Sequence, residues 1–508
     1  MKIGLGLNGK LVAAVVCALV GGSGATLAQV ISPRAIAASG TAEPATPIWE
    51  THLAVGTTGG AGQDVLALFN TWFGYADPGT VGYAYWNGTV WSEDQIKVDD
   101  GNGNPNDDTT DGHQVDPVVH FDGLAQTFTC LAMNDQSGQN RLAVAHFDAG
   151  DPSAVRWRDF WPTDHNPYYL DKPWLVPGEN YGGQREYYVL ATYERVDDND
   201  PTRQDFAYMR SIDGGQTWYG EQIVLPLVQA RGRWIWPAVV DDGPLYAACA
   251  ENYGATGTRV RFLIGVDDNT DPQEPRVSFS RLQCGIGGGF NGLDGFGDSI
   301  DLPVQNCLQV LINRRNVQDL VPGGFLDKVY TIPQLAADPT DPNRLYLVYH
   351  DTDPEAPSDV NVYLTSLVYS GGQWTALPRV KVNNDGNAAT DQFLPSIVVD
   401  DFGVIHVIFY DDRRYVQGDS APDAKYDVWY ARSVDGGTNF EDNIELWGLS
   451  GLPALDETTA STNLRKPGEY IGITYFPPLD QVWTSYGGTS LFDPSNEQTV
   501  IWSSKIQQ

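Results

Sequence analysis

The sequence predicts an all-β fold, a β-propeller of six or seven four-stranded blades with seven favoured. Short runs rich in β-branched and aromatic residues alternate with clusters of Gly, Asp, Asn and Pro, and long helical periodicity is nearly absent. One phrase also recurs along the chain: a Pro, an apolar stretch, an Asp, a turn, and a second apolar run that ends in polar residues. Units of this kind suit blades of four strands joined by loops of variable length.

Seven copies of this unit can be identified. The clearest is LPSIVVDDFGVIHVIFYDDRR around Pro395, and an N-terminal unit from DVLALFNTWF to YAYWNGTVWSED matches the later strands of the pattern. The other copies begin near Pro117, Pro173, Pro237, Pro333 and Gly468. We therefore expect one propeller over residues 49–508 with an insert at about 284–328. A strand near 49–55 should close the ring by pairing with the last blade, since closure removes open sheet edges.

The N-terminus predicts export. Lys2 and Lys10 supply positive charge before a short apolar run, small residues follow, and Ala28 is suited to precede a cleavage site. Residues 1–28 are thus read as a secretory signal peptide and 29–48 as a linker, which predicts a secreted or periplasmic protein. The net charge of -34 disfavours nucleic acid as a partner. No later stretch is long and apolar enough for a membrane span, and we expect a monomer.

Four cysteines follow the signal segment. Cys284 and Cys307 flank the Gly-rich start of the insert and are the expected disulfide pair, because export permits disulfides. Cys130 and Cys249 lie in apolar runs and are expected to be buried thiols.

Two segments share the pattern Ser-x-Asp-x-Gly followed by an aromatic residue, and both follow a strand that ends in Arg-Ser. This pattern resembles the Asp-box, or BNR repeat, of the sialidase-like propeller superfamily. The resemblance implies a structural turn between the third and fourth strands of a blade, on the face opposite the active site, with the Asp accepting backbone N–H bonds. The residues that carry it are Ser211, Asp213, Gly215, Trp218, Ser433, Asp435, Gly437 and Phe440.

Strand alternation then places the site. If the Asp-box joins the third and fourth strands, the ends of the second strands and the loops entering the first strands open on the other face, around one mouth. The wider ring of polar residues expected there includes Asp391 and Asp412. Carboxylates bond hydroxyls, aromatic rings stack on sugars, and Arg grips acidic groups. We select Glu194, Glu251 and Asp411 as candidate catalytic residues, and Arg233, Trp234, His350, Asp351 and Arg413 as candidate ligand-binding residues.

The resemblance implies an extracellular glycan as partner and leaves the activity open. Sialidases carry an N-terminal Arg-Ile-Pro phrase, and this chain has none. The alternatives are a glycoside hydrolase, a polysaccharide lyase with a His or Tyr base, a non-catalytic propeller that binds glycan or protein, and a purely structural scaffold.

No cofactor is required by any of these activities. The oxygen-rich loop at 99–111 nevertheless has the spacing of a calcium site, with Asp100, Asn102, Asn104 and Asp111 as candidate ligands.

Overall fold

The structure is a computed structural model of the whole chain. It describes residues 29–38, 48–57, 63–71, 80–98, 114–136, 139–148, 156–159, 168–181, 183–195, 204–223, 232–239, 245–253, 257–267, 277–281, 292–293, 299–300, 309–312, 333–352, 359–386, 390–413, 425–446, 455–456, 470–489 and 499–507. These residues form an all-β fold with a single 3-10 turn, Pro477–Leu479. Among them, no helix is long and apolar enough to cross a membrane.

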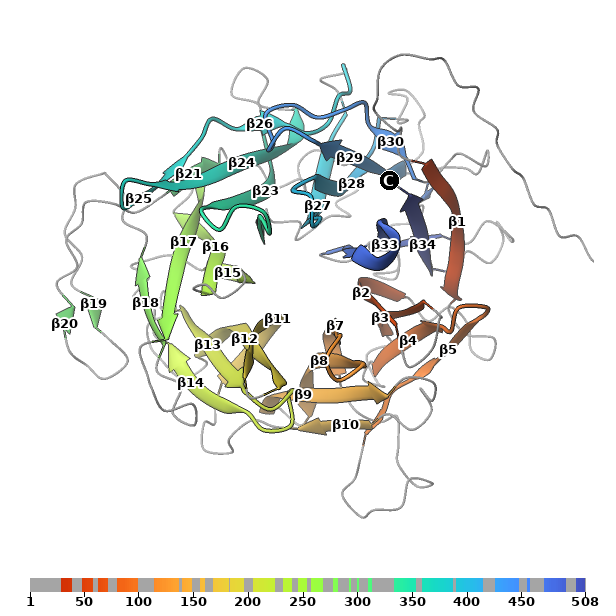
Figure 1. Cartoon of the computed structure of the whole chain (residues 1–508), viewed down its shortest axis with the longest axis vertical. Helices are drawn as coiled ribbons and strands as arrows, with labels where there is room; N and C mark the ends of the chain where they lie inside the picture. Colours follow the sequence, from red (N-terminus) through yellow and green to blue (C-terminus); the bar gives the residue numbers. More distant parts are fainter. Residues whose placement is uncertain are drawn as a thin grey trace, which may run out of the picture.

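Within the described residues, seven sheets contain four or five strands each, and Figure 1 shows them around a common centre in chain order. The first sheet is β2 (Ile48–Gly56), β3 (Asp64–Thr71), β4 (Thr80–Trp86) and β5 (Trp91–Gln95). The second is β7 (Gln114–Asp122), β8 (Thr127–Gln136), β9 (Gln139–Asp148) and β10 (Arg156–Asp159), with β6 (Lys97–Val98) parallel to β10. The third is β11 (Tyr168–Tyr181), β12 (Gln184–Arg195), β13 (Gln204–Ser211) and β14 (Tyr219–Ile223).

The fourth sheet is β15 (Gly232–Val239), β16 (Leu245–Tyr253), β17 (Gly257–Asp267) and β18 (Val277–Arg281), with β21 (Gln309–Ile312) also on β17. The fifth is β22 (Gln334–Ala337), β23 (Arg344–Thr352), β24 (Val360–Ser370) and β25 (Gln373–Ala376), with β26 (Val380–Lys381) on β24. The sixth is β27 (Gln392–Val399), β28 (Ile405–Asp411), β29 (Lys425–Ser433) and β30 (Ile444–Glu445), with β31 (Leu455–Asp456) on β29. A separate hairpin pairs β19 (Gly292–Leu293) with β20 (Ser299–Ile300).

The seventh sheet joins the two ends of the chain and corrects the expected closure. It consists of β32 (Gly472–Phe476), β33 (Gln481–Thr489), β34 (Thr499–Gln507) and β1 (Gln29–Ala38), which pairs antiparallel with β34. The strand expected to close the ring, near 49–55, is instead β2, and it pairs with β3. The prediction was wrong because residues 48–95 already supply four strands to the first sheet. The apolar run Gln29–Ala38, interpreted as linker, covers the edge that β34 would otherwise leave open.

The core lies between neighbouring sheets. Side chains of β24 and β28, such as Leu364 and Val407, pack in one buried cluster between the fifth and sixth sheets. Leu53 of β2 and Trp483 of β33 pack together between the first and last sheets, and the hydroxyls of Thr51 and Ser485 are 3.0 Å apart there. Because alternate residues of a strand face opposite sides, each sheet contributes to two such layers.

The marker prolines of the repeat have a structural cause. In β7, β11 and β27 the residue before the proline has positive φ, with values of 57° at Asp116, 51° at Lys172 and 48° at Leu394. Each lies in a register shift of the first strand against the second. A bulge at this position turns the start of the first strand, and a left-handed non-glycine residue is uncommon enough to mark a selected feature.

Candidate functional site

The two Ser-x-Asp-x-Gly segments form the turns between third and fourth strands, β13–β14 and β29–β30, as expected. In the second turn Asp435 Oδ1 accepts the backbone N–H groups of Thr438 at 3.0 Å and Asn439 at 2.9 Å, and the hydroxyl of Ser433 at 2.8 Å. Gly436 and Gly437 have φ of 71° and 81°. The segment at 211–218 repeats these bonds around Asp213. Both carboxylates are fully engaged by their own turns.

The other ends of the strands carry the candidate site residues. Glu194, Glu251 and Asp411 each lie at the end of a second strand, opposite residues at the start of the first: Tyr169, Gly232 and Gln392. For Glu194, Glu251, Arg233 and Trp234 the structure describes the backbone only, so their side-chain roles stay predictions.

The fifth and sixth sheets show side chains at this edge. We call it the β23–β28 edge and define it by Asp351, Asp359, Arg379, Asp385, Asp391, Asp411, Asp412 and Arg413. Asp411 is fully buried, and its Oδ2 accepts two N–H groups of Arg413, Nη2 at 2.6 Å and Nε at 2.8 Å. The guanidinium lies 3.7 Å from the ring centroid of Trp429. Burial raises the pKa of Asp411 although Arg413 opposes that shift.

Asp391 and Asp412 form a close pair. The backbone N–H of Asp391 donates to Asp412 Oδ1 at 2.5 Å, and the N–H of Asp412 donates to the Asp391 carbonyl at 3.1 Å. Burial, with repulsion from Asp391, raises the pKa of Asp412 to about 8. Burial, with repulsion from Asp359, Asp385 and Asp411, raises the pKa of Asp391 to about 7. Both carboxyls therefore hold a proton for part of the time near neutral pH.

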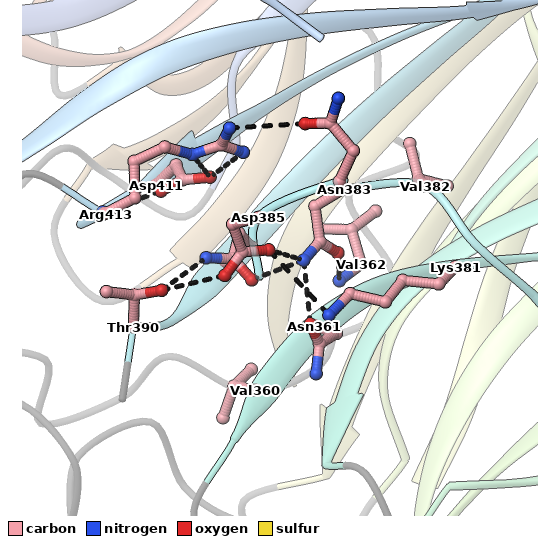
Figure 2. A network of polar contacts seen from close by, with 12 residues as sticks. Val360, Asn361, Val362, Lys381, Val382, Asn383, Asp385, Thr390, Asp411 and Arg413 are labelled. Atoms are coloured by element: carbon pink, nitrogen blue, oxygen red, sulfur yellow. Dashed lines mark hydrogen bonds and ion pairs between the residues drawn. The ribbon is translucent and has the colours of Figure 1, made fainter. Parts of the chain in front are cut away.

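A buried amide network lies at the same edge, and Figure 2 shows it near Asp411 and Arg413. Asn383 Nδ2 contacts Asn361 Oδ1 at 2.7 Å, Gln392 Oε1 at 2.6 Å and the carboxylate of Asp385. The Thr390 hydroxyl donates to Asp385 Oδ2 at 2.8 Å. This network ties the segment that enters β27 to the start of β24.

His350 and Asp351 end β23. The imidazole of His350 is 1% exposed, its Nδ1 accepts the Leu394 N–H at 3.3 Å, and burial lowers its pKa to about 3. Asp351 is buried and bonded to Arg379 Nη1 at 2.6 Å, with the guanidinium 3.9 Å from the Tyr363 ring centroid. A neutral, enclosed His350 does not favour the lyase alternative, which needs an accessible base.

The structure brings Asp411 and Arg413 together, and it adds residues that were not selected from the sequence. Asp391 and Asp412 belonged to the expected ring, but nothing in the sequence distinguished them from other strand-end aspartates. Arg379 was missed. The feature that could have identified Arg379 is the short strand β26, which directly follows it and brings the chain back to this edge after β25.

Several predictions fall outside the described residues: the candidate calcium ligands Asp100, Asn102, Asn104 and Asp111, and the pair Cys284 and Cys307. Cys130 is a buried free thiol. In the described part, no group of three or more His, Cys, Asp or Glu side chains is arranged to hold a metal ion.

Comparison with known proteins gives distant likenesses. No protein-family model matches the chain, and no curated protein matches it in sequence. Among solved structures, a Penicillium chrysogenum α-L-arabinanase is 9% identical with a TM-score of 0.43, and 94% of this chain covers 98% of that one. A PL25 ulvan lyase is 13% identical with a TM-score of 0.47, at 93% and 95% coverage.

A Trypanosoma rangeli sialidase is 10% identical with a TM-score of 0.39, and 94% of this chain covers 59% of that chain. At these values neither a shared activity nor a shared substrate follows.

Proposed function

We propose that this chain is a secreted or periplasmic glycoside hydrolase with its site at the β23–β28 edge. The observation that supports the proposal is the Asp391–Asp412 pair, with pKa values raised to about 7 and 8. Cleavage of a glycosidic bond needs a carboxylic acid that still holds a proton near neutral pH and delivers it to the leaving-group oxygen. Neighbouring buried carboxyls supply such a group without a cofactor.

The two members of the pair have different roles in this proposal. Asp412 is half-buried and has the higher pKa, so it donates the proton. Asp391 is 5% exposed and also accepts the Val360 N–H at 3.1 Å, so it positions the segment and raises the pKa of Asp412 through its charge. The second catalytic carboxylate is Glu194 or Glu251, both near the ends of second strands, whereas the buried Asp411 holds Arg413.

A closed seven-bladed propeller is part of the same proposal. Seven sheets in chain order and the pairing of β1 with β34 support it. The disulfide Cys284–Cys307, a calcium ion at Asp100–Asp111 and a monomeric state remain predictions for this protein.

A non-catalytic glycan-binding propeller is the second candidate. The observation in its favour is that Asp391 and Asp412 also satisfy backbone N–H groups, which fixes the loops as a rigid binding surface would require.

The test is a panel of polysaccharides and aryl glycosides, with released reducing ends and unsaturated products measured separately. We expect reducing ends without unsaturated products, and a loss of about 100-fold or more in kcat for Asp412→Asn with substrate affinity retained. Asp94→Asn, which removes an exposed charge in the first sheet, is the matched control. Unsaturated products would indicate a lyase, and binding without any product would favour the second candidate.

A further inference from the structure

Both arginines described at the β23–β28 edge are already neutralised by carboxylates. Arg413 uses Nε and Nη2 on Asp411, and Arg379 uses Nη1 on Asp351 at 2.6 Å. Asp351 and Asp411 are themselves buried, so each arginine compensates a charge that has little access to water. Removing either arginine from its carboxylate would leave a buried charge unpaired, which is costly.

Further N–H groups of Arg413, and one ring face of each guanidinium, are also engaged. Arg413 Nη1 contacts Asn384 Oδ1 at 3.4 Å, and Nη2 contacts Asn443 Oδ1 at 3.3 Å. The guanidiniums of Arg413 and Arg379 stack on Trp429 and Tyr363. A sugar carboxylate or sulfate is normally recognised by an arginine fork that is open to the ligand. The fork of Arg413 is turned to the protein, and Arg379 binds a buried carboxylate through Nη1.

The edge contains more carboxyl groups than cations. The carboxyls are Asp351, Asp359, Asp385, Asp391, Asp411 and Asp412, of which Asp391 and Asp412 are partly protonated near neutral pH, and the described cations are Arg379, Arg413 and Lys381. Each cation already lies against a carboxylate, since Lys381 Nζ is 3.8 Å from Asp385 and the two arginines are paired as above. An incoming anion would therefore find no unpaired cation among these three.

A buried hydrogen-bond donor lies in the same place. Asn361 is fully buried, its Oδ1 accepts from Asn383, and its Nδ2 has no hydrogen-bond partner among the described residues. In Figure 2 this amide lies directly beside the Asp385 network. A buried donor without an acceptor costs free energy, so the β23–β28 edge is not arranged for stability alone.

From these contacts we infer that the β23–β28 edge selects neutral glycans and rejects sugars that carry carboxylate or sulfate groups. Sugar hydroxyl groups can donate to Asp412, a half-buried carboxyl of this edge, and no charge has to be neutralised. This substrate class rests on the proposed glycan site at the same edge.

The test compares neutral and acidic glycans on the purified full chain. Binding is measured by calorimetry for neutral arabinan, galactan and xylan oligosaccharides, and for polygalacturonate fragments and a sialylated oligosaccharide. We expect at least tenfold tighter binding of one or more neutral glycans than of either acidic one.

The ion pairs supply a second readout. Asp411→Asn releases Arg413 and Asp351→Asn releases Arg379, so each variant should bind the acidic glycans at least tenfold more tightly than the native chain. Asp94→Asn removes the same formal charge away from the edge and should show no change, and melting temperatures confirm that each variant is folded.

The outcomes distinguish failure of the neutral substrate class from failure of the proposed glycan site. Preferential binding of an acidic glycan by the native protein overturns the neutral substrate class while leaving the glycan site intact. Binding of no glycan by folded protein overturns the proposed function as well. Should one variant fail to fold, the other still tests whether a released arginine admits an acidic sugar.

Discussion

Two aspartates of the sixth sheet occupy opposite ends of its strands and have opposite electrostatic states. Asp435, in the β29–β30 turn, accepts hydrogen bonds from Ser433, Thr438 and Asn439; although burial opposes the shift, these bonds hold its pKa below the usual value. Asp412, just after β28, is largely enclosed among other carboxyls, and its pKa rises to about 8. Hydrogen-bond donors lower the pKa of Asp435, whereas burial and neighbouring carboxylates raise the pKa of Asp412.

In this molecule the two kinds of aspartate have different roles, one in stability and the other in chemistry. A carboxylate that is satisfied by its own turn contributes to folding and has no spare capacity for a ligand. A carboxyl kept protonated by its neighbours destabilises the fold at neutral pH and is suited to proton transfer. Each of the following experiments alters one side of this contrast.

The largest expected effect is on the pH dependence of turnover. If Asp412 donates the proton, kcat should fall about tenfold per pH unit above pH 8, because the acid form is then lost. Asp391→Asn removes the charge that contributes to the raised pKa, so this limb should move to lower pH. The measurement is kcat from pH 5 to 10 with the best glycan of the panel. A limb that stays in place in Asp391→Asn contradicts the coupling.

At the other end of the sheet, Asp435→Ala should lower stability and leave glycan binding unchanged. The variant leaves the N–H groups of Thr438 and Asn439 without their acceptor, as does the loss of a helix cap, which costs about 1–2 kcal/mol. Urea unfolding measures this loss, with Asp94→Ala as the control for charge. Lost binding at unchanged stability would mean that the turn belongs to a site.

The contrast also shows how far the sequence predicts this molecule. The repeat and the Ser-x-Asp-x-Gly turns are local patterns, and the all-β sheets and the position of the turns follow from them. The bulges at Asp116, Lys172 and Leu394, which explain the marker prolines, were not predicted. Alternation alone predicted that the ends of the second strands, with Asp411 and Arg413 among them, lie around one mouth, and the structure shows these two side chains as an ion pair.

Strand alternation does not predict which partner each side chain bonds to, or whether the side chain is buried. Asp411 and Asp412 are adjacent in sequence, yet one is bonded to Arg413 and the other contacts Asp391, twenty-one residues away. Burial of His350 and the ion pair of Asp351 with Arg379 likewise depend on neighbouring strands. The closing strand was missed because both Gln29–Ala38 and Ile48–Gly56 are apolar, and only the strand count of the first sheet distinguishes them.

A smaller effect is expected on the pH dependence of stability. The pKa of Asp412 is about 8 in the folded chain and 3.8 for the unperturbed group, so the folded state holds more protons between these values. Native stability from this group therefore falls as pH rises through that window. Asp412→Asn cannot ionise, so its melting temperature relative to the native chain should be higher at pH 8 than at pH 5. A difference independent of pH would show that Asp412 titrates normally.

The smallest expected effect has the opposite sign and comes from His350. Burial lowers its pKa from 6.5 to about 3, so below pH 6.5 the unfolded chain binds a proton that the folded chain does not. Stability from this group is present above pH 6.5 and is lost as pH falls toward 3. His350→Gln should therefore lose less melting temperature than the native chain between pH 6.5 and 4.

The difference for His350→Gln is small because His52 and His120 are shifted in the same direction, to about 4 and 3, and continue to act in the variant. An equal loss in both proteins would show that His350 becomes protonated while folded. That result would place the imidazole in contact with water at the β23–β28 edge, where it could serve a ligand, and it would restore the base that a lyase needs.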